Sequence, residues 1–336
     1  MDLSLRDSKI FSVTAVITAY NNAQYIGRAI ESVLNQTYKP EKIIVINDGS
    51  TDNTEEAIAL FKHNILYIHQ KNCGASGARN CGILKATSTW IAFLDGDDEW
   101  LPDHLERSRC LIKENPHLHW TTGNFITCLA KDNRSSVKKS ISSVHQHLGQ
   151  KAYFDDYFSA CVNDFWGHTN TMIVQKETLI EAGLFKVGQL IANDLDMWFR
   201  IAYLYPSIGY NPTPTAIYYL DIDDSISKKY KQSDHKQVLI ANHLALAKKQ
   251  NRLAAFEPCA SKMLKRWIRS MLFDKHKSAE IKILLKAFSN LYTWYYKLSI
   301  KCLLIHPPTT GKACHGISAI IRKLNLRREV VKKHSS

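Results

Sequence analysis

Four acidic residues crowd into five positions directly after a short apolar run. The run 90–94 ends at Asp95, and Asp97, Asp98 and Glu99 follow it in the stretch STWIAFLDGDDEWLPDHL. Carboxylates this close repel one another, so they must be spread into water, protonated or neutralised by a bound cation. Mg²⁺ or Mn²⁺ is typically held by one or two carboxylates, and phosphate oxygens complete its shell. A cation here therefore implies a phosphorylated ligand, whereas a solvated turn is the alternative reading of the acidic run taken alone.

Two further polar clusters follow apolar runs in the same way. The run 10–20 ends in Thr18 and Tyr20, and the run 41–48 ends in Asp48. In a parallel sheet the carboxyl ends of all strands share one edge, and ligands of open α/β sheets bind there. A carboxylate and an aromatic ring suit the hydrogen bonds and stacking that a nucleoside requires. We therefore expect one crevice that joins these clusters to the acidic run.

A loop with two glycines opens a predicted helix at GASGARN, residues 74–80. Arg79 and Asn80 at this helix start suit phosphate recognition. The glycine spacing is not GxGxxG, and the first strand–helix turn, TAYNNAQ, has no glycine. A dinucleotide site of the Rossmann kind is therefore not expected.

The elements that must position these residues alternate along the first hundred positions. Apolar runs predict strands, and helical spacing of apolar residues predicts helices between them. This alternation predicts an α/β fold with a mainly parallel sheet and helices on both faces. Thr51 or Asp52 is expected to cap the second helix, and the polar stretch 131–143 is expected to be a loop. The predicted strands are 10–20, 41–48, 65–70 and 89–95, and the predicted helices are 22–37, 51–63 and 74–87.

Charge divides the 336-residue chain into two parts. Residues 231–336 contain 22 Lys and Arg against 5 Asp and Glu, a net charge of +17, whereas residues 1–230 contain 22 against 26. This asymmetry predicts two domains, 1–230 and 231–336, of which the second is helical and basic and meets an anionic surface.

The motifs together are familiar. VTAVITAYNNAQYIGRAIESVLNQTY, IIVINDGSTDNT, GASGARNCGI and IAFLDGDDEWLP resemble glycosyltransferase family 2, with its GT-A fold, over about residues 10–225. The resemblance implies inverting transfer of a sugar from a nucleotide-diphosphate donor, UDP-linked by family habit, to an acceptor hydroxyl. It implies a nucleoside site at Thr18, Tyr20 and Asp48, a DxD motif at Asp95 and Asp97 with Asp98 beside it, and Mn²⁺ or Mg²⁺. The donor residues are then Thr18, Tyr20, Asp48, Arg79 and Asp95, and the metal residues are Asp97 and Asp98.

The family also requires a base, in a motif that reads roughly ED-x-x-L-W-x-R. The stretch ANDLDMWFRIA matches it and places Asp194 at the base position, where it takes the proton of the attacking hydroxyl. The alternative role of Asp194 is a helix N-cap. Asp196 is expected to be structural. Asn193 and Asn47 stand where the family often has an acid.

The stretch DFWGHTNTMIVQKETLIEAGLF resembles the acceptor-side segment of the family, and its Trp166 and His168 are candidates for an acceptor pocket. An aromatic ring packs well on a sugar face, although Trp166 suits core packing equally.

The basic tail mixes apolar residues with Lys and Arg at helical spacing in segments 259–277, 284–305 and 317–334. Such helices can lie in a membrane interface, and a helical cap with a solvated basic face is the alternative. The first 13 residues contain no apolar core segment, so we expect a cytoplasmic protein, peripheral on the membrane, with a glycan or lipid-linked acceptor. No nucleic acid is expected as a partner.

Two other functions compete with a glycosyltransferase of cell-surface polysaccharide synthesis. A nucleotidyltransferase also uses acids, a metal and a nucleotide in an α/β sheet. A catalytically dead domain attached to a membrane- or nucleic-acid-binding tail is the alternative outside the enzymes, and the intact Asp48, Asp97 and Asp194 argue against it.

Overall fold

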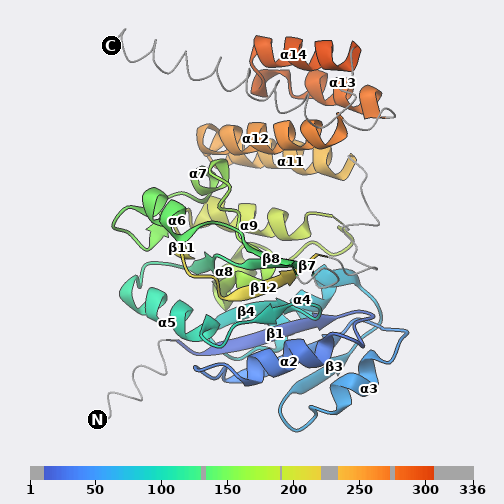
Figure 1. Ribbon diagram of the computed structural model, residues 1–336, viewed down its shortest axis with the longest axis vertical. Coiled ribbons are helices and arrows are strands. Elements are labelled where there is room, and N and C mark those ends of the chain that lie inside the picture. The colour runs from blue at the N-terminus through green and yellow to red at the C-terminus, as the bar shows by residue number, and fades with distance from the viewer. Residues whose placement is uncertain (1–10, 130–133, 190, 221–233, 273–276, 306–336) are drawn as a thin grey trace. The chain divides into compact units, whose positions relative to one another are not determined.

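The computed structural model describes residues 11–129, 134–189, 191–220, 234–272 and 277–305 (Figure 1). The chain divides into two compact units, Met1–Arg252 and Leu253–Ser336. Helix α11 (Asp234–Lys249) lies in the first unit. The predicted domain boundary at residue 230 stays a prediction, and the compact units themselves divide at residue 252.

An eight-stranded sheet with the order β3-β2-β1-β4-β10-β6-β11-β9 forms the centre of the first unit. Its first four strands pair in parallel. Strand β10 runs antiparallel between β4 and β6, and β9 runs antiparallel to β11 at the edge. The predicted α/β fold is therefore confirmed, with a sheet that becomes mixed beyond β4. The strands are β1 Val13–Ala19, β2 Lys42–Asn47, β3 Leu66–His69, β4 Trp90–Asp95, β6 Trp120–Gly123, β9 Tyr153–Phe154, β10 Ile173–Gln175 and β11 Ile208–Asn211.

Helices cover both faces of this sheet because side chains alternate along each strand. Val13, Ala15 and Ile17 of β1 share a core with the apolar face of α2 (Ile26–Leu34). The intervening Val16 faces α4 (Gly74–Lys85), where a Cβ on Gly82 would lie 2.4 Å from Val16 Cγ1. Glycine at position 82 therefore lets α4 approach the sheet closely.

The remaining helices of the first unit connect and flank the strands, and two expectations for this region were wrong. Helix α3 has Asn53 as its N-cap, not Thr51 or Asp52; Asp52 instead accepts hydrogen bonds from the N–H and hydroxyl of Thr54. The predicted loop 131–143 contains a strand, β8, whose side chains are all exposed and therefore carry no apolar signal. These helices are α3 Thr54–Ala59, α5 His104–Glu114, α6 Ile141–Leu148, α7 Tyr157–Val162, η2 Thr169–Thr171, α8 Lys176–Glu181 and α9 Asn193–Leu204.

A second sheet of four strands, with the order β5-β12-β7-β8, begins directly after the acidic run. Its strands are two to four residues long; β12 pairs with β5 and with β7, and β7 pairs with β8. They are β5 Glu99–Trp100, β7 Ile126–Leu129, β8 Arg134–Val137 and β12 Ala216–Tyr219.

The second unit is helical where the structure describes it, as the sequence predicts. Its helices α12 (Leu253–Met271), α13 (Ser278–Ala287) and α14 (Trp294–Ile305) bury Phe256, Leu264 and Leu284 among their apolar residues. The short η4 (Ser289–Leu291) links α13 to α14. Among the described residues, every helix falls short of the length and apolarity that crossing a membrane requires. The predicted segment 317–334 lies outside the described residues.

Candidate active site

The carboxyl ends of β1, β2 and β4 bring the three polar clusters to one edge of the sheet. Thr18 lies opposite Asp95 in the register, and its hydroxyl donates to Asp95 Oδ1 at 3.3 Å. The N–H of Asp48 donates to the carbonyl of Ala19 at 2.9 Å. Tyr20 follows β1, and its side chain is 44% exposed. The crevice expected from the sequence therefore has its polar groups side by side.

The Asp48 carboxylate is buried at the turn after β2. Its Oδ1 accepts hydrogen bonds from Gln70 Nε2 at 2.6 Å and from the N–H of Cys73 at 2.9 Å. Gly49 adopts φ +72°, and a Cβ there would lie 2.8 Å from the nitrogen of Asn72. The turn therefore requires glycine, and it holds Asp48 against the first turn of α4.

Arg79 joins two segments that lie far apart in the sequence. Its side chain is 6% exposed, and it donates to Asp95 Oδ1 at 2.7 Å and to Asn193 Oδ1 at 3.4 Å. Burial alone would lower the pKa of Arg79, but Asp95, Asp194 and Asp97 raise it. The guanidinium therefore stays charged. Its Nε is buried, with no hydrogen-bond partner among the described residues.

The three aspartates of the acidic run differ in charge. Burial would raise the pKa of Asp95, but the Arg79 guanidinium beside it holds that pKa below its ordinary value. Burial and the charge of Asp95 raise the pKa of Asp97 to about 6. Burial and the charges of Asp97 and Asp95 raise the pKa of Asp98 well above its ordinary range. Arg79 therefore stabilises the charged form of Asp95, whereas burial and mutual repulsion disfavour the charged forms of Asp97 and Asp98.

Asp98 is the most enclosed of the three, with an exposed fraction of 1%. Its Oδ1 accepts from the N–H of Tyr219 at 3.2 Å, and its Oδ2 accepts from Asn170 Nδ2 at 3.0 Å. The carboxylate thereby ties the acidic run to the second sheet and to η2. Asn170 Oδ1 is buried without a hydrogen-bond partner among the described residues.

Asp194 lies in the first turn of α9, which starts after Ala192 in the left-handed conformation at φ +55°. Ala192 is the N-cap, so Asp194 does not cap the helix, and its Oδ1 accepts from the N–H of Leu195 at 2.8 Å. The charge of Asp194 raises the pKa of Arg79 and of His168, which places it within electrostatic reach of both. The predicted base therefore faces the same group of residues as the predicted donor site.

His168 and Trp166 lie on the other side of the acidic run. The His168 ring lies 4.2 Å from the ring of Tyr218, between centroids, and its Nδ1 is 4.0 Å from Asp98 Oδ2. Burial lowers the pKa of His168, although Asp95 opposes the shift. Trp166 is partly exposed, and its indole N–H donates to Asp164 Oδ1 at 3.4 Å. A surface position therefore fits Trp166 better than core packing does.

Sequence reasoning missed Arg28, which supports the acidic run from α2. Its guanidinium donates to the carbonyl of Asp97 at 2.7 Å, lies 3.7 Å from the ring centroid of Tyr219 and is 3.8 Å from Glu99 Oε2. Nothing in the local sequence distinguishes this arginine from an ordinary solvent-facing one. Its role depends on residues 69 to 191 positions further along the chain.

Asn80 does not have the predicted role of facing phosphates. Its amide donates to the carbonyl of Phe185 at 2.8 Å and accepts from the N–H of Phe185 at 2.9 Å. Both hydrogen-bonding groups are therefore used to hold α4 to the loop before α9. Asn47 is also internal, since its amide donates to Tyr67 Oη and accepts from the N–H of Ser50.

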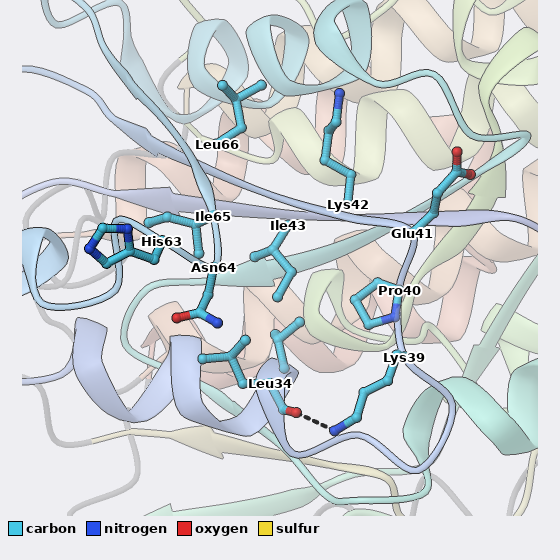
Figure 2. Close-up of a pocket in the computed structure, with 11 residues that line it drawn as sticks. Leu34, Lys39, Pro40, Glu41, Lys42, Ile43, His63, Asn64, Ile65 and Leu66 are labelled. Carbon is cyan, nitrogen blue, oxygen red and sulfur yellow. Dashed lines mark hydrogen bonds between the residues drawn. The ribbon is translucent and has the colours of Figure 1, made fainter.

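A groove of about 460 Å³ lies at the opposite edge of the sheet, where β2 and β3 begin (Figure 2). Figure 2 shows Lys39 turned toward the end of α2, where its ammonium donates to the carbonyl of Leu34. Glu41 Oε2 accepts from Ser88 at 2.8 Å. These charged groups have partners already, and none of the predicted site residues lines the groove. Its lining is Val33, Leu34, Lys39, Pro40, Glu41, Lys42, Ile43, His63, Asn64, Ile65 and Leu66.

Comparison with known sequences identifies the same region. Residues 14–158 match the family model described as glycosyl transferase family 2. An uncharacterized glycosyltransferase of Rickettsia conorii is 34% identical over 201 residues, which are 59% of this chain and 31% of that protein. One of Rickettsia typhi is 39% identical over 199 residues, 56% of this chain and 58% of that protein. The chain thus spans about a third to somewhat over half of these relatives.

Comparison of folds extends the similarity further along the chain. Residues 1–349 of TarS from S. aureus, in complex with UDP-GlcNAc, match 84% of this chain and 80% of that one. The TM-score is 0.67 and the sequence identity is 15%. At this identity the likeness establishes a shared fold, the GT-A fold.

Proposed function

We propose that this chain, whose residues 14–158 match the model of glycosyltransferase family 2, transfers a sugar from a UDP-linked donor to a hydroxyl group of a glycan or lipid-linked acceptor, with inversion. The observation that carries the proposal is the meeting of Asp95, Asp97 and Asp194 around Arg79, at the edge of the sheet where Asp48 also follows its strand. Such an enzyme takes part in the synthesis of cell-surface polysaccharide or lipopolysaccharide.

The donor nucleotide is proposed to lie along the ends of β1 and β2. The exposed ring of Tyr20 offers a stacking surface for a base, and the fixed carboxylate of Asp48 offers an acceptor for a base or ribose donor. Thr18 and Asp95 border the same space. The choice of uridine draws support from the structure of TarS in complex with UDP-GlcNAc, which shares this fold.

Asp194 is proposed to be the base. A sugar hydroxyl is a poor nucleophile until a carboxylate accepts its proton as attack develops, which contributes about 10²- to 10⁴-fold. Asp194 lies within electrostatic reach of Arg79, so the proposed base and the proposed donor site belong to one group of residues. A single in-line displacement inverts the anomeric carbon and needs one base. The proposed reaction therefore does not require the second carboxylate that retaining hydrolases use.

Asp97 and Asp98 are proposed to hold Mn²⁺ or Mg²⁺. The residues fit a divalent cation because burial and mutual repulsion raise the pKa of both carboxylates, and added positive charge relieves that repulsion. Among the described residues, no three His, Cys, Asp or Glu side chains gather to form a complete ligand set, so donor phosphates would complete the shell. When bound, the ion supplies positive charge to the leaving diphosphate.

The acceptor is proposed to approach past Trp166 and His168. Trp166 is partly exposed, and the His168 and Tyr218 rings lie together beside the acidic run. Aromatic faces of this kind pack against the apolar face of a sugar ring. A glycan acceptor therefore suits this side of the crevice.

The first test is a thermal-shift panel with UDP, GDP, CMP, UDP-sugars and the nucleoside triphosphates, each with Mn²⁺ or EDTA. A ligand that binds only the folded state raises the melting temperature by mass action. We expect a metal-dependent shift with UDP compounds that is lost in Asp97→Ala and retained in Asp103→Asn, an exposed acid paired with Arg107. Shifts with every nucleoside triphosphate and none with UDP-sugars would favour a nucleotidyltransferase, and no shift at all would favour a catalytically dead domain.

The second unit is proposed to associate with the cytoplasmic face of an anionic membrane. Over residues 253–305, ten Lys and Arg stand against three Asp and Glu. Trp294 and Leu298 of α14, and Ile283 of α13, are 68%, 52% and 55% exposed. Positions 294 and 298 share one face of the helix, and tryptophan beside lysines is typical of helices in the lipid interface. Each basic residue near an anionic leaflet adds about 1 kcal/mol.

Sedimentation with vesicles tests the membrane association. We expect binding to vesicles that contain phosphatidylserine, much weaker binding to pure phosphatidylcholine, and a several-fold loss in Trp294→Ala. Ile180→Ala is the matched control, because Ile180 is 47% exposed in the first unit. Equal binding by Trp294→Ala and wild type would leave the basic helices as a solvated cap. Binding of RNA in place of vesicles would assign the charge to nucleic acid.

A further inference from the structure

Helix α9, which carries the proposed base, is held by a second buried aspartate two positions further on. Asp196 is 1% exposed, whereas Asp194 faces Arg79. Two residues correspond to about 200° around a helix. The two carboxylates therefore project from nearly opposite sides of the first turn. Because both belong to the same turn of one helix, a movement that displaces Asp196 also displaces Asp194.

Three donors from three segments converge on the Asp196 carboxylate. Lys186 Nζ donates to Oδ1 at 2.6 Å, Arg200 Nε donates to Oδ2 at 2.8 Å, and His243 Nε2 lies 3.2 Å from Oδ1. Burial would raise the pKa of Asp196, but His243, Lys186 and Arg200 together hold it well below its ordinary value. This carboxylate is therefore ionised and fixed.

The first two donors belong to α9 and to the loop before it. Arg200 also donates to the carbonyls of Ala182 and Leu184, the latter at 2.7 Å. Gln189 donates to the carbonyls of Ile191 and Ala192 at the start of the helix. These contacts are local, and they shape the loop that delivers α9.

The third donor comes from α11, a different helix from the one that carries Asp194 and Asp196. His243 is 1% exposed, and its ring lies 5.1 Å from Phe199 and 5.8 Å from Tyr203, between centroids. Tyr203 Oη also donates to the carbonyl of His243 at 3.0 Å. Phe199 and Tyr203 of α9 thus contact His243 of α11, and His243 also contacts Asp196 in the turn that carries Asp194.

We propose that His243 is a positioning residue of the transferase site, which acts through Asp196 to fix the place of Asp194. The inference rests on the proposed function, because it assumes that Asp194 is the base. It makes α11 part of the catalytic machinery although α11 lies outside residues 14–158. Displacement of a reacting group by about 1 Å can cost about 10²-fold in rate, so the loss of one anchor suffices to slow the chemical step.

The test compares three full-length variants. In His243→Ala we expect kcat to fall about ten-fold or more, with the KM for donor within about two-fold of wild type, because the nucleotide contacts at β1 and β2 are untouched. His243→Gln, whose amide can donate in place of Nε2, should recover most of kcat. Leu239→Ala removes a buried apolar side chain of α11, 4% exposed, without touching Asp196, and controls for simple destabilisation.

The outcomes separate this inference from the function on which it rests. Wild-type kcat in His243→Ala, or an equal loss in Leu239→Ala at the same melting temperature, would overturn the positioning role. So would failure of His243→Gln to recover activity. Hydrogen exchange over 193–204 adds a readout that needs no turnover: His243→Ala should speed exchange there, and unchanged exchange would overturn the anchor. Wild type that transfers no sugar despite the anchor would instead overturn the proposed function.

Discussion

Two buried acidic sites in the first unit have opposite electrostatics. At the acidic run, three buried aspartates lie together, Asp95 pairs with Arg79, and the pKa of Asp97 rises to about 6. At Asp196, three donors serve one carboxylate, and its pKa falls well below the ordinary value. Buried carboxylates that lack partners cost stability, whereas a fully paired one is costly to disturb. The first site is therefore organised for a ligand that brings positive charge, and the second for holding the chain together.

The two edges of the large sheet teach a related lesson. The groove where β2 and β3 begin is open, yet its Lys39 and Glu41 already have protein partners. The crevice at the other edge holds acids with excess charge. Chemistry is therefore expected where buried carboxylates repel one another, not in this groove, whose Lys39 and Glu41 are already paired.

The largest effect should come from the base. We expect Asp194→Asn to lower kcat by about 10³-fold, because the amide cannot accept a proton, with little change in melting temperature. Steady-state transfer kinetics with a UDP-sugar check this, with Asp103→Asn as the control. Retention of a tenth or more of wild-type kcat would remove Asp194 from the role of base.

The next largest effect is expected on stability, at the fully paired Asp196. We expect Asp196→Asn to lower the free energy of unfolding by about 3 kcal/mol, because it leaves Lys186, Arg200 and His243 without their carboxylate. Urea denaturation at pH 7 measures it. Asp155→Asn is the control, since Asp155 pairs with Lys151 on the surface and its side chain is 70% exposed. A loss no larger than that of the control would contradict a structural role for Asp196.

The difference in stability between wild type and Asp196→Asn is expected to depend on pH. Because the pKa of Asp196 is lowered on folding, its contribution to stability is present above the unfolded pKa of about 4. That contribution is lost as the pH falls below this value toward the folded pKa. The gap between wild type and Asp196→Asn should thus be constant from pH 7 to pH 5 and should narrow only in more acidic solution. Narrowing between pH 7 and pH 5 would assign the effect to another group.

The smallest effect has the opposite sign. We expect Asp98→Asn to raise the free energy of unfolding by about 1 kcal/mol in EDTA, because it removes one of three neighbouring buried charges. An amide at position 98 can still accept from the N–H of Tyr219. It loses the hydrogen bond from Asn170 Nδ2 but can donate to Asn170 Oδ1, which is buried and unpaired among the described residues, once the Asn170 amide turns over. Denaturation in EDTA measures the stability of the variant, and metal-dependent UDP binding measures its ability to hold the metal. A variant that is less stable and binds UDP normally would reverse the assignment.

The first four strands could be predicted from the sequence because each is a continuous apolar run, and such a run is a local property. The sequence also indicated which residues follow each strand, and parallel pairing then required that Thr18, Asp48 and Asp95 meet. Strand β8 could not be predicted, because its side chains are all exposed. Strands β5, β7 and β12 have two to four residues each and are fixed by partners far along the chain.

The candidate site divides in the same way. The types and order of Asp48, Asp95, Asp97 and Asp194 were determined by the sequence, since a motif is a matter of residue type and spacing. Only the tertiary structure decided that the pKa of Asp95 is lowered, that the pKa of Asp97 is raised, and which groups Arg79 contacts. It also decided that Asn80 is used internally and that His243 reaches Asp196 across 47 positions. The physical reason is that pKa and hydrogen bonding depend on burial and on charges from distant segments, which no local pattern records.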